Sequence, residues 1–144
     1  MTDRPDAVDY VIDASALAKL FLDEPESTAF REWYLAEVHR GATFAAPSLL
    51  GYEIAHLLAK NLKAPVGGKE GAEWLGARHD EVMEGITLDE DAARQTFLWA
   101  LKLTGYDASY LAVAVAGRAC LVSYDLALLN EAARHKVRTQ APKQ

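Results

Sequence analysis

The stretch that decides the fold is DYVIDASALAKLFL, residues 9–22. Its first four residues, 9–12, have the short apolar pattern of a buried strand. The spacing of apolar residues then predicts a helix from Ala14 to Leu22, with Ser15 as a candidate N-cap. Asp13 lies at the junction between the two. A strand that passes directly into a helix is typical of a sheet covered by helices, so this stretch indicates an α/β fold.

The rest of the chain repeats this alternation. Further strands are predicted at 43–46, 85–88, 119–123 and 137–139. Further helices are predicted at 26–40, 47–62, 69–83, 89–103, 107–118 and 125–135. Short apolar strands that alternate with helices predict a parallel sheet covered by helices. In such a sheet the binding site lies at the carboxyl ends of the strands.

Length and composition favour one small acidic domain. We expect a single domain over residues 1–144, with loose ends at 1–8 and 140–144. No apolar stretch is long enough to cross a bilayer, and the N-terminus lacks a signal-peptide pattern, so a cytoplasmic location is expected. The lone Cys120 lies in an apolar run and is expected to be a buried, inert thiol. The net charge of −6 is unlike a general nucleic-acid binder, so any such function must rest on a local site.

Two aspartates follow predicted strands. Asp13 comes directly after the strand that ends at Ile12, and Asp125 follows the apolar run 121–124. If both strands are central and parallel, their carboxyl ends meet at one edge of the sheet. We therefore expect the two carboxylates to share that edge.

Two further acidic residues belong to predicted helices. Glu53 lies in or beside the apolar stripe of its helix, which is formed by Leu49, Leu50, Ile54 and Leu57. A carboxylate in that position needs a cation or hydrogen-bond donors. Asp107 opens a helix that is apolar nearly all round, and the positive end of the helix dipole favours its ionised form.

Each acid also has a structural interpretation when taken alone. The three aspartates are suited to cap the helices that follow them. Glu53 could extend into solvent from the edge of its stripe, or pair with Lys60 or Lys63. The combination of all four favours convergence on one cleft. Converged carboxylates stay ionised together only when a divalent cation neutralises them, and ligands that are all oxygen favour Mg²⁺ or Mn²⁺. Such ions activate water and stabilise the leaving oxygen in phosphodiester hydrolysis.

Four segments resemble a known family. They are YVIDASALAKLF (10–21), APSLLGYEIA (46–55), LTGYDASYLAVA (103–114) and LVSYDLALL (121–129). In order and spacing they resemble the PIN-domain nucleases, and most closely the VapC-like toxins of prokaryotic toxin–antitoxin pairs. The segments cover almost the whole chain, and the four in order are highly specific.

The resemblance implies roles for individual residues. The catalytic and metal-binding acids of the family fall, in chain order, on Asp13, Glu53, Asp107 and Asp125. The three aspartates would hold the principal metal, and the glutamate would complete the site or position the attacking water. Supporting hydroxyl groups fall on Ser15 and Ser123, although simple helix capping by Ser15 is an alternative.

The resemblance also implies a fold, an activity and partners. It implies a three-layer α/β/α fold with a central parallel sheet, a homodimer, and Mg²⁺- or Mn²⁺-dependent cleavage of RNA. It further implies the toxin of a type II toxin–antitoxin system, whose small antitoxin partner blocks the acidic groove. Residues 66–88 match no motif and are expected to shape the substrate groove or the dimer surface.

Two other functional hypotheses compete with the nuclease. The first is a catalytically inactive PIN-like module that binds RNA or protein through the same groove, which the intact set of four acids disfavours. The second is phosphoryl transfer through an aspartyl-phosphate at Asp13. Ser15 stands where the D-x-D pattern of that chemistry needs a second aspartate, so it is disfavoured as well.

The remaining polar and aromatic residues carry weaker hypotheses. His56 follows Glu53 at the spacing of an E-x-x-H pair, but the second such pair of a di-iron site is absent from the sequence. Candidate phosphate contacts, each also explained as a solvated charge, are Lys19, Lys60, Lys63, Lys102 and Arg118. The basic tail at Arg134, Lys136 and Arg138 could contact RNA or an antitoxin. Core or interface positions are expected for Trp33, Trp74 and Trp99.

Overall fold

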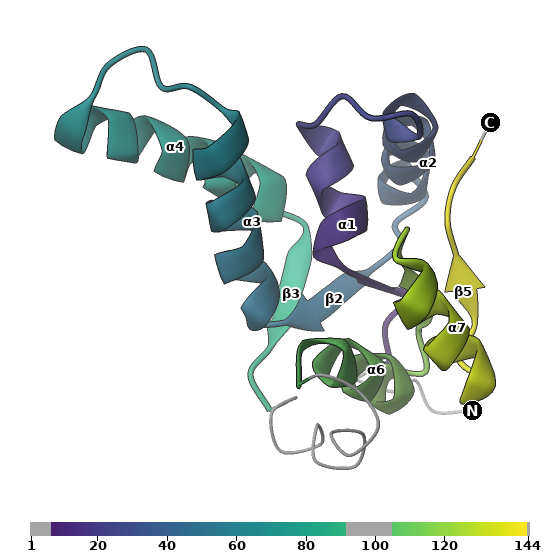
Figure 1. Ribbon diagram of the computed structural model, residues 1–144. Helices are drawn as coiled ribbons and strands as arrows, with labels where there is room; N and C mark the ends of the chain where they lie inside the picture. The colour runs from purple at the N-terminus through teal and green to yellow at the C-terminus, as the bar shows by residue number, and fades with distance from the viewer. Residues whose placement is uncertain (1–6, 92–104, 144) are drawn as a thin grey trace.

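The computed structural model describes residues 7–91 and 105–143. Within them, one five-stranded sheet has the order β3-β2-β1-β4-β5, and each neighbouring pair of strands is parallel (Figure 1). The strands are β1 (Tyr10–Ile12), β2 (Phe44–Pro47), β3 (Ile86–Asp89), β4 (Cys120–Val122) and β5 (Thr139–Gln140). The predicted α/β fold with a central parallel sheet is confirmed.

Helices cover both faces of this sheet. The described helices are α1 (Ala14–Leu17), the 3₁₀ helix η1 (Ala18–Leu20), α2 (Ser27–His39), α3 (Leu49–Asn61), α4 (Gly68–Met83), α6 (Gly105–Gly117) and α7 (Leu126–Arg134). In Figure 1, α6 lies below the sheet, and α1 and α2 lie above it. The apolar helix α6 packs against β1, β2 and β4, as expected for a helix that is apolar nearly all round.

The register of the two central strands positions the candidate site. The side chains of β1 and β4 are almost wholly buried, which explains their continuous apolar sequences. Ile12 of β1 lies beside Val122 of β4. The next residue on each strand, Asp13 and Ser123, therefore leaves the sheet at the same carboxyl edge.

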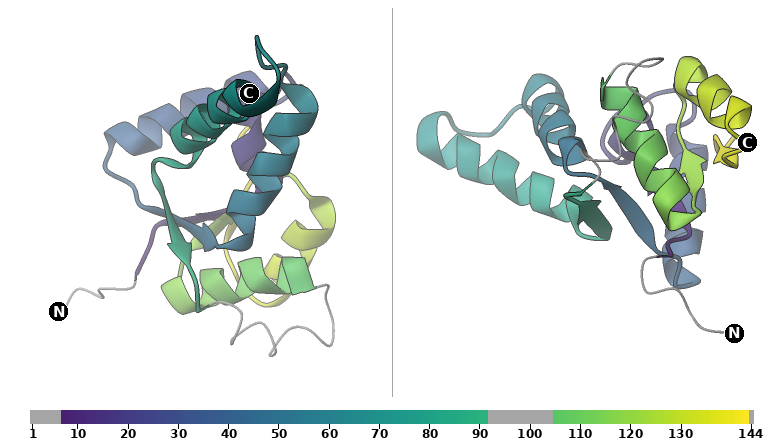
Figure 2. Two further views of the ribbon diagram at one scale, coloured as in Figure 1. Left: turned by 90° about the vertical axis from the view of Figure 1, so that its left-hand side faces the viewer. Right: turned by 90° about the horizontal axis from the view of Figure 1, so that it is seen from below.

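Helix α4 accounts for most of the segment 66–88, which matched no motif. It packs on α3, and the pair projects from the rest of the molecule (Figure 2). The buried residue of α4 is Gly71, where a Cβ would meet the carbonyl oxygen of Val66. The segment before α4 passes so close to Gly71 that only a residue without a side chain fits at position 71.

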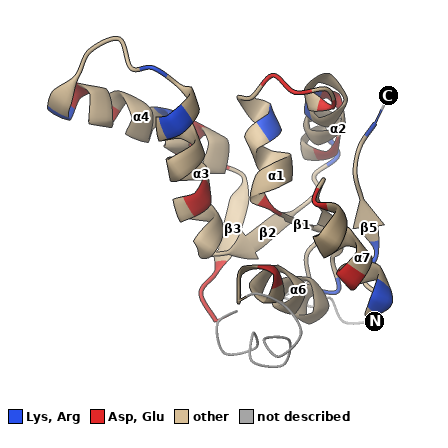
Figure 3. Cartoon of the chain, in the orientation of Figure 1, with Lys and Arg blue, Asp and Glu red and all other residues tan. Residues whose placement is uncertain are grey.

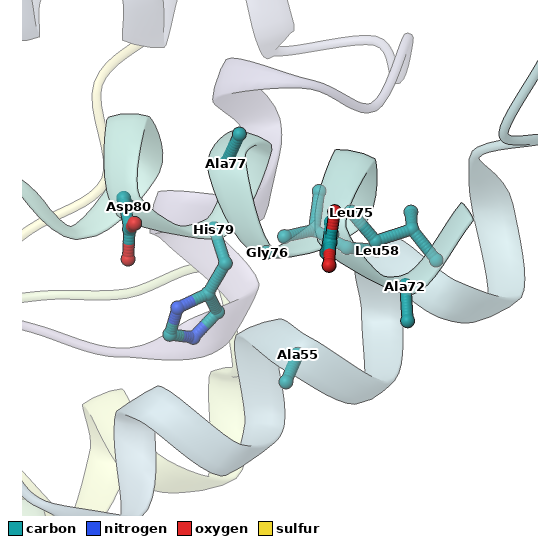
Figure 4. A pocket seen from close by; sticks show the side chains of 9 residues that line it. Ala55, Leu58, Ala72, Leu75, Gly76, Ala77, His79 and Asp80 are labelled. Carbon is teal, nitrogen blue, oxygen red and sulfur yellow. The ribbon is translucent and has the colours of Figure 1, made fainter. Parts of the chain in front are cut away.

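A cavity of about 660 Å³ lies between α3 and α4 (Figure 4). Its lining includes short side chains at Ala55, Ala72 and Ala77, which hold the two helices close without filling the space between them. The His79 Nε2 lies 2.7 Å from the carbonyl oxygen of Gly51 and ties α4 to the start of α3. None of the four candidate acids lines this cavity.

The first predicted helix differs from the structure. It was expected to continue to Leu22, but α1 ends at Leu17 and a 3₁₀ turn follows. Side chains of α2 capture carbonyl groups at this point: Arg31 donates to the Lys19 and Leu22 oxygens, and Ser27 Oγ donates to the Leu22 oxygen at 2.6 Å. Contacts with α2 therefore hold the turn that follows this helix.

Three other expectations need correction or fall outside the described residues. Gln140 is part of β5, and the Pro142 oxygen accepts from the Tyr124 hydroxyl at 2.6 Å, so the end of the chain is held at these two positions rather than loose from 140 onward. Asp89 ends β3 and does not begin a helix. Most of the helix predicted at 89–103 lies outside the described residues.

In the part of the chain that the structure describes, no helix is long and apolar enough to cross a membrane.

Candidate functional site

Asp13 occupies a nearly closed cradle at the carboxyl edge of the sheet. Its side chain is part of a residue that is 5% exposed. Oδ1 accepts from Ser15 Oγ at 2.7 Å and from the Ala16 N–H at 3.1 Å, and Oδ2 accepts from Ser123 Oγ at 2.6 Å. A carboxylate has about four acceptor positions, so three of them are filled. The remaining one is on Oδ2, which is the atom that Asp13 can offer to a ligand.

Burial raises the pKa of Asp13 to about 6. The hydrogen bonds from Ser123, Ser15 and the Ala16 N–H oppose this rise, and the negative charge of Asp125 adds to it. Burial outweighs the donors because a carboxylate loses most of its hydration in this position. Ionised Asp13 is thus held at a free-energy cost that a nearby cation would relieve.

Ser15 and Ser123 connect the Asp13 cradle to the start of α7. Ser15 Oγ accepts from the Tyr124 N–H at 3.0 Å, and Ser123 Oγ accepts from the Asp125 N–H at 3.0 Å. Because each hydroxyl accepts one backbone N–H, its proton is directed at Asp13. The expectation that Ser15 caps the first helix is wrong, since Ser15 lies inside α1 and the capping side chain is Asp13.

Asp125 lies at the same edge but in a different environment. It is exposed, and it caps α7: its Oδ1 accepts from the Ala127 and Leu128 N–H groups. The interpretation of Asp125 as a helix cap is therefore correct. It does not conflict with a second role, because the capping bonds use only Oδ1.

Glu53 is half-buried on α3 and is held by a residue that the sequence analysis did not single out. Its Oε1 accepts from the Tyr110 hydroxyl at 2.6 Å. Tyr110 is buried on α6, and both burial and the charge of Glu53 raise the pKa of Tyr110 well above its usual range. A buried tyrosine needs a partner for its hydroxyl, and Tyr110 stands one helical turn after Asp107. The sequence therefore placed Tyr110 near an acidic residue but did not identify Glu53 as its partner.

Asp107 completes the set from the first turn of α6. Burial raises its pKa, and so does the charge of Asp125. Burial also raises the pKa of Glu53, with a contribution from Asp107. Electrostatic repulsion therefore links Asp13 to Asp125, Asp125 to Asp107, and Asp107 to Glu53. Figure 3 shows acidic positions at the starts of α1, α6 and α7 and on α3, around one region of the fold.

The donor chemistry of this edge suits a hard cation. Carboxylate and hydroxyl oxygens are ligands that Mg²⁺ and Mn²⁺ accept. Among the described residues, no three His, Cys, Asp or Glu side chains lie close enough together to hold one ion. Mg²⁺ is commonly bound by only one or two carboxylates, with waters and substrate phosphates completing its shell. The residues thus fit such an ion as pairs of carboxylates and not as a closed cage.

The candidate phosphate contacts differ in exposure: one is buried and three are exposed. The fifth, Lys102, lies outside the described residues. Lys19 was expected to be a groove or surface cation, and that is wrong. It is 4% exposed, forms ion pairs with Glu24 and Glu26, and lies 4.4 Å from the ring centre of Tyr124. Of the other candidates, Lys60, Lys63 and Arg118 are exposed.

The basic tail lies at the opposite edge of the sheet from Asp13. Arg118, Lys136 and Arg138 line a cavity of about 280 Å³ there, beyond the ends of α6 and α7. Arg134 pairs with Glu131 at 3.3 Å. Cations at the C-terminal ends of helices are favoured by the helix dipole, which accounts for part of this cluster.

Of the tryptophans, Trp33 is placed as expected, against the core. Its ring lies edge-on to Tyr10, with ring centres 4.9 Å apart. Trp74 lies beneath Arg78, and Trp99 is outside the described residues. His56 is exposed and lines a cavity together with Glu53.

Comparisons with known proteins agree with this geometry. The crystal structure of PAE2754 from Pyrobaculum aerophilum superposes with a TM-score of 0.58 at 29% sequence identity, over 87% of this chain and 86% of that chain. No curated protein matches the sequence. The PIN domain family matches residues 10–134, a span that contains all four acids. The chain therefore belongs to the PIN domain family, whose members are generally nucleases.

Proposed function

We propose that this protein is a metal-dependent endoribonuclease that hydrolyses RNA phosphodiester bonds. One observation carries the proposal: four carboxylates from four different segments repel one another at the carboxyl edge of the sheet, and the most deeply buried of them is fixed by three donors. Burial of these carboxylates, with a smaller contribution from their mutual repulsion, costs stability, and such a cost favours a functional role over a structural one. PIN domains also usually bind Mg²⁺ or Mn²⁺.

In the proposed site, Asp13, Asp107 and Asp125 hold the metal, directly or through water, and Glu53 completes the site. The bound ion would lower the pKa of a water and stabilise the leaving oxygen of the phosphodiester. Asp13 offers Oδ2, because Oδ1 already has two donors. Glu53 offers Oε2, because Tyr110 occupies Oε1, and this oxygen is the one that can accept a proton from the attacking water.

A cleavage assay with matched variants tests this function. The purified chain is incubated with a panel of labelled RNAs in Mg²⁺ and in Mn²⁺, beside EDTA and an Asp13→Asn variant. Asparagine can keep the N-cap bond to the Ala16 N–H while removing the charge, so we expect a folded protein that does not cleave. Circular dichroism and thermal unfolding establish that the fold is retained. Loss of fold in Asp13→Asn would identify Asp13 as a structural residue instead.

The same assay distinguishes the binding-module hypothesis. A folded wild-type protein that binds RNA but does not cleave it in any divalent ion would support the module. Cleavage that disappears both with EDTA and in Asp13→Asn would exclude it.

We further propose that the protein is the toxin of a type II toxin–antitoxin pair and acts in the cytoplasm as a homodimer. The support is the resemblance of four ordered segments to VapC-like toxins. A short open reading frame beside the gene would encode the antitoxin. Expression of this chain alone should arrest growth, and co-expression of the neighbouring frame should restore it. Growth arrest that persists in Asp13→Asn would exclude a toxic activity that depends on the carboxylate site, and light scattering of the purified chain tests the dimer.

A further inference from the structure

A second cavity, of about 350 Å³, adjoins the carboxylates. It opens between α1, α3 and α6, and the side chains that matter for its chemistry are Ala14, Tyr52, Glu53, His56 and Tyr106. Its size is at the lower end of the range for small-molecule sites, which suits a group no larger than one nucleoside. Its lining contains aromatic, aliphatic and acidic groups, and among the described residues that line it there is neither lysine nor arginine.

The cavity is built from the immediate neighbours of three of the four acids. Ala14 follows Asp13 in the chain, and Tyr106 precedes Asp107. Glu53 is itself part of the lining, between Tyr52 and His56. Whatever occupies the cavity therefore lies beside the carboxylates, and the same elements position both.

Two tyrosines on this cavity are exposed to an unusual degree. Tyr52 is 77% exposed and Tyr106 is 65% exposed. One exposed aromatic side chain is ordinary for a soluble protein. Two that come from different helices and line one cavity, beside a carboxylate, form a surface on which a flat ring can stack.

We propose that this cavity binds one unpaired nucleobase of the RNA substrate, next to the phosphodiester that is cleaved. The inference rests on the proposed nuclease function and names the part of the substrate that the site recognises. The described lining offers no lysine or arginine that could pair with a phosphate, so a base suits this cavity better than a phosphate does. Stacking of a base against both Tyr52 and Tyr106 supplies affinity without a positive charge, and such stacking tolerates all four bases. His56 at the same cavity carries ring nitrogens that can hydrogen-bond to a base edge.

A base inside a duplex is stacked and paired, and its ring faces are not available to tyrosine. A base in a loop or a single strand can turn into the cavity while its phosphate remains at the carboxylates.

The test measures RNA binding separately from cleavage. Short labelled single strands, oligo(A) and oligo(U), are titrated with the full-length protein in Ca²⁺, a hard cation that also takes oxygen ligands. Anisotropy gives the affinity for wild type, Tyr52→Ala, Tyr106→Ala and the corresponding Tyr→Phe variants. Phenylalanine keeps the stacking face and loses only the hydroxyl. Leu35→Ala, which truncates another exposed apolar side chain on α2, is the control for surface truncation.

We expect each Tyr→Ala variant to weaken binding by about 5- to 100-fold, the range for loss of one stacked base. The Tyr→Phe variants and Leu35→Ala should retain most of the affinity. Wild-type protein should also lose affinity for a strand that carries one abasic position at the cleavage site, and the Tyr→Ala variants should no longer distinguish that strand from the intact one.

The outcomes separate this inference from the function on which it rests. Wild-type binding and cleavage that are unchanged in both Tyr→Ala variants would overturn the nucleobase site and leave the nuclease intact. Equal losses in Tyr→Ala and Tyr→Phe would overturn stacking, because the hydroxyl would then be the contact. Failure of the wild-type chain to bind or cleave any RNA would overturn both.

Discussion

Two strand-to-helix junctions meet at the carboxyl edge of the sheet, and they use the same sequence pattern to different effect. In each, a buried strand is followed by an aspartate that caps the next helix: Asp13 between β1 and α1, and Asp125 between β4 and α7. Asp13 is buried and has donors from three residues, whereas Asp125 is exposed and has donors only from its own helix. Capping alone therefore does not explain both residues.

The difference in depth has a simple cause in the register. Asp13 directly follows Ile12, whereas Ser123 and Tyr124 stand between Val122 and Asp125. Ser123 occupies the position on β4 that Asp13 occupies on β1, and it turns its hydroxyl toward Asp13. The two extra residues carry Asp125 out into solvent. The first junction thus supplies a buried carboxylate, Asp13, that is fixed by its donors and destabilised by burial. The second supplies a carboxylate, Asp125, that is accessible to solvent.

The largest difference between the two junctions, in cleavage and in stability, is expected when each aspartate is lengthened by one methylene. Asp13→Glu places an extra carbon in a closed cradle, which should destabilise the protein by about 1–3 kcal/mol and move the carboxylate from its donors. We expect RNA cleavage to fall to background. Asp125→Glu is exposed and should keep measurable cleavage. Both variants are compared by cleavage rate and by denaturant unfolding.

A result in which Asp13→Glu cleaves as well as Asp125→Glu would contradict this view of the two junctions. It would mean that the Asp13 cradle tolerates a shifted carboxylate, and the three donors would then serve only to cap α1. Asp13→Asn is the control for volume, because asparagine fits the same space without the charge.

The pH dependence of stability should report on the buried junction, through Asp13. The pKa of Asp13 is about 6 in the folded protein and 3.8 in its ordinary state, so the folded protein binds this proton more tightly than the unfolded chain does. Stability must therefore fall as the pH rises from about 4 to above 6, by at most about 3 kcal/mol for this one group. Asp13→Asn should remove this part of the profile.

Measurement is by thermal unfolding in EDTA between pH 4 and 8, with the difference between wild type and Asp13→Asn isolating the one carboxyl. Mg²⁺ should recover stability at neutral pH in wild type more than in Asp13→Asn, because it binds the ionised form in the folded state. Parallel profiles of the two proteins in EDTA would show that Asp13 is not held with a raised pKa.

The sequence was sufficient to place the two junctions at one edge of the sheet. It was insufficient to predict which side chains would bond to one another around that edge. Asp13 and Asp125 could be assigned to one edge because each follows an apolar strand, and parallel strands align their carboxyl ends. The bond from Tyr110 to Glu53 joins residues 57 positions apart, and local periodicity carries no information about such a pair. Lys19 was misplaced for the same reason: its ion pairs with Glu24 and Glu26 depend on how the chain turns back after η1.

Removing the two serine hydroxyls should show which one fixes Asp13. Ser123→Ala takes away the sole donor to Oδ2 among the described hydrogen bonds, and it leaves the Asp125 N–H without its acceptor. Ser15→Ala takes away one of two donors to Oδ1 and leaves the Tyr124 N–H without its acceptor. Ser123 is fully buried and Ser15 is half-buried, so we expect a loss of about 1–3 kcal/mol for Ser123→Ala and less for Ser15→Ala.

The readout that separates a positioning role from a structural one is the pH profile of cleavage. Both serines lower the pKa of Asp13, so either alanine variant should raise it and move the acidic limb of the profile to higher pH. Ser→Thr at either position keeps the hydroxyl and serves as the conservative control. Stability losses without any movement of the acidic limb would mean that the serines support the fold only.

The smallest loss of stability is expected at the exposed junction, that of Asp125. Asp125→Ala removes the side-chain acceptor for two N–H groups at the start of α7, and loss of such a cap typically costs about 0.5–2 kcal/mol. Asp125→Ser keeps a capping oxygen and should recover most of that stability, as measured by chemical denaturation. It does not restore the carboxylate, so cleavage should remain low in both variants. If Asp125→Ser recovered cleavage together with stability, Asp125 would be a cap and nothing more, and the metal would have to be held by the buried junction and α6 alone.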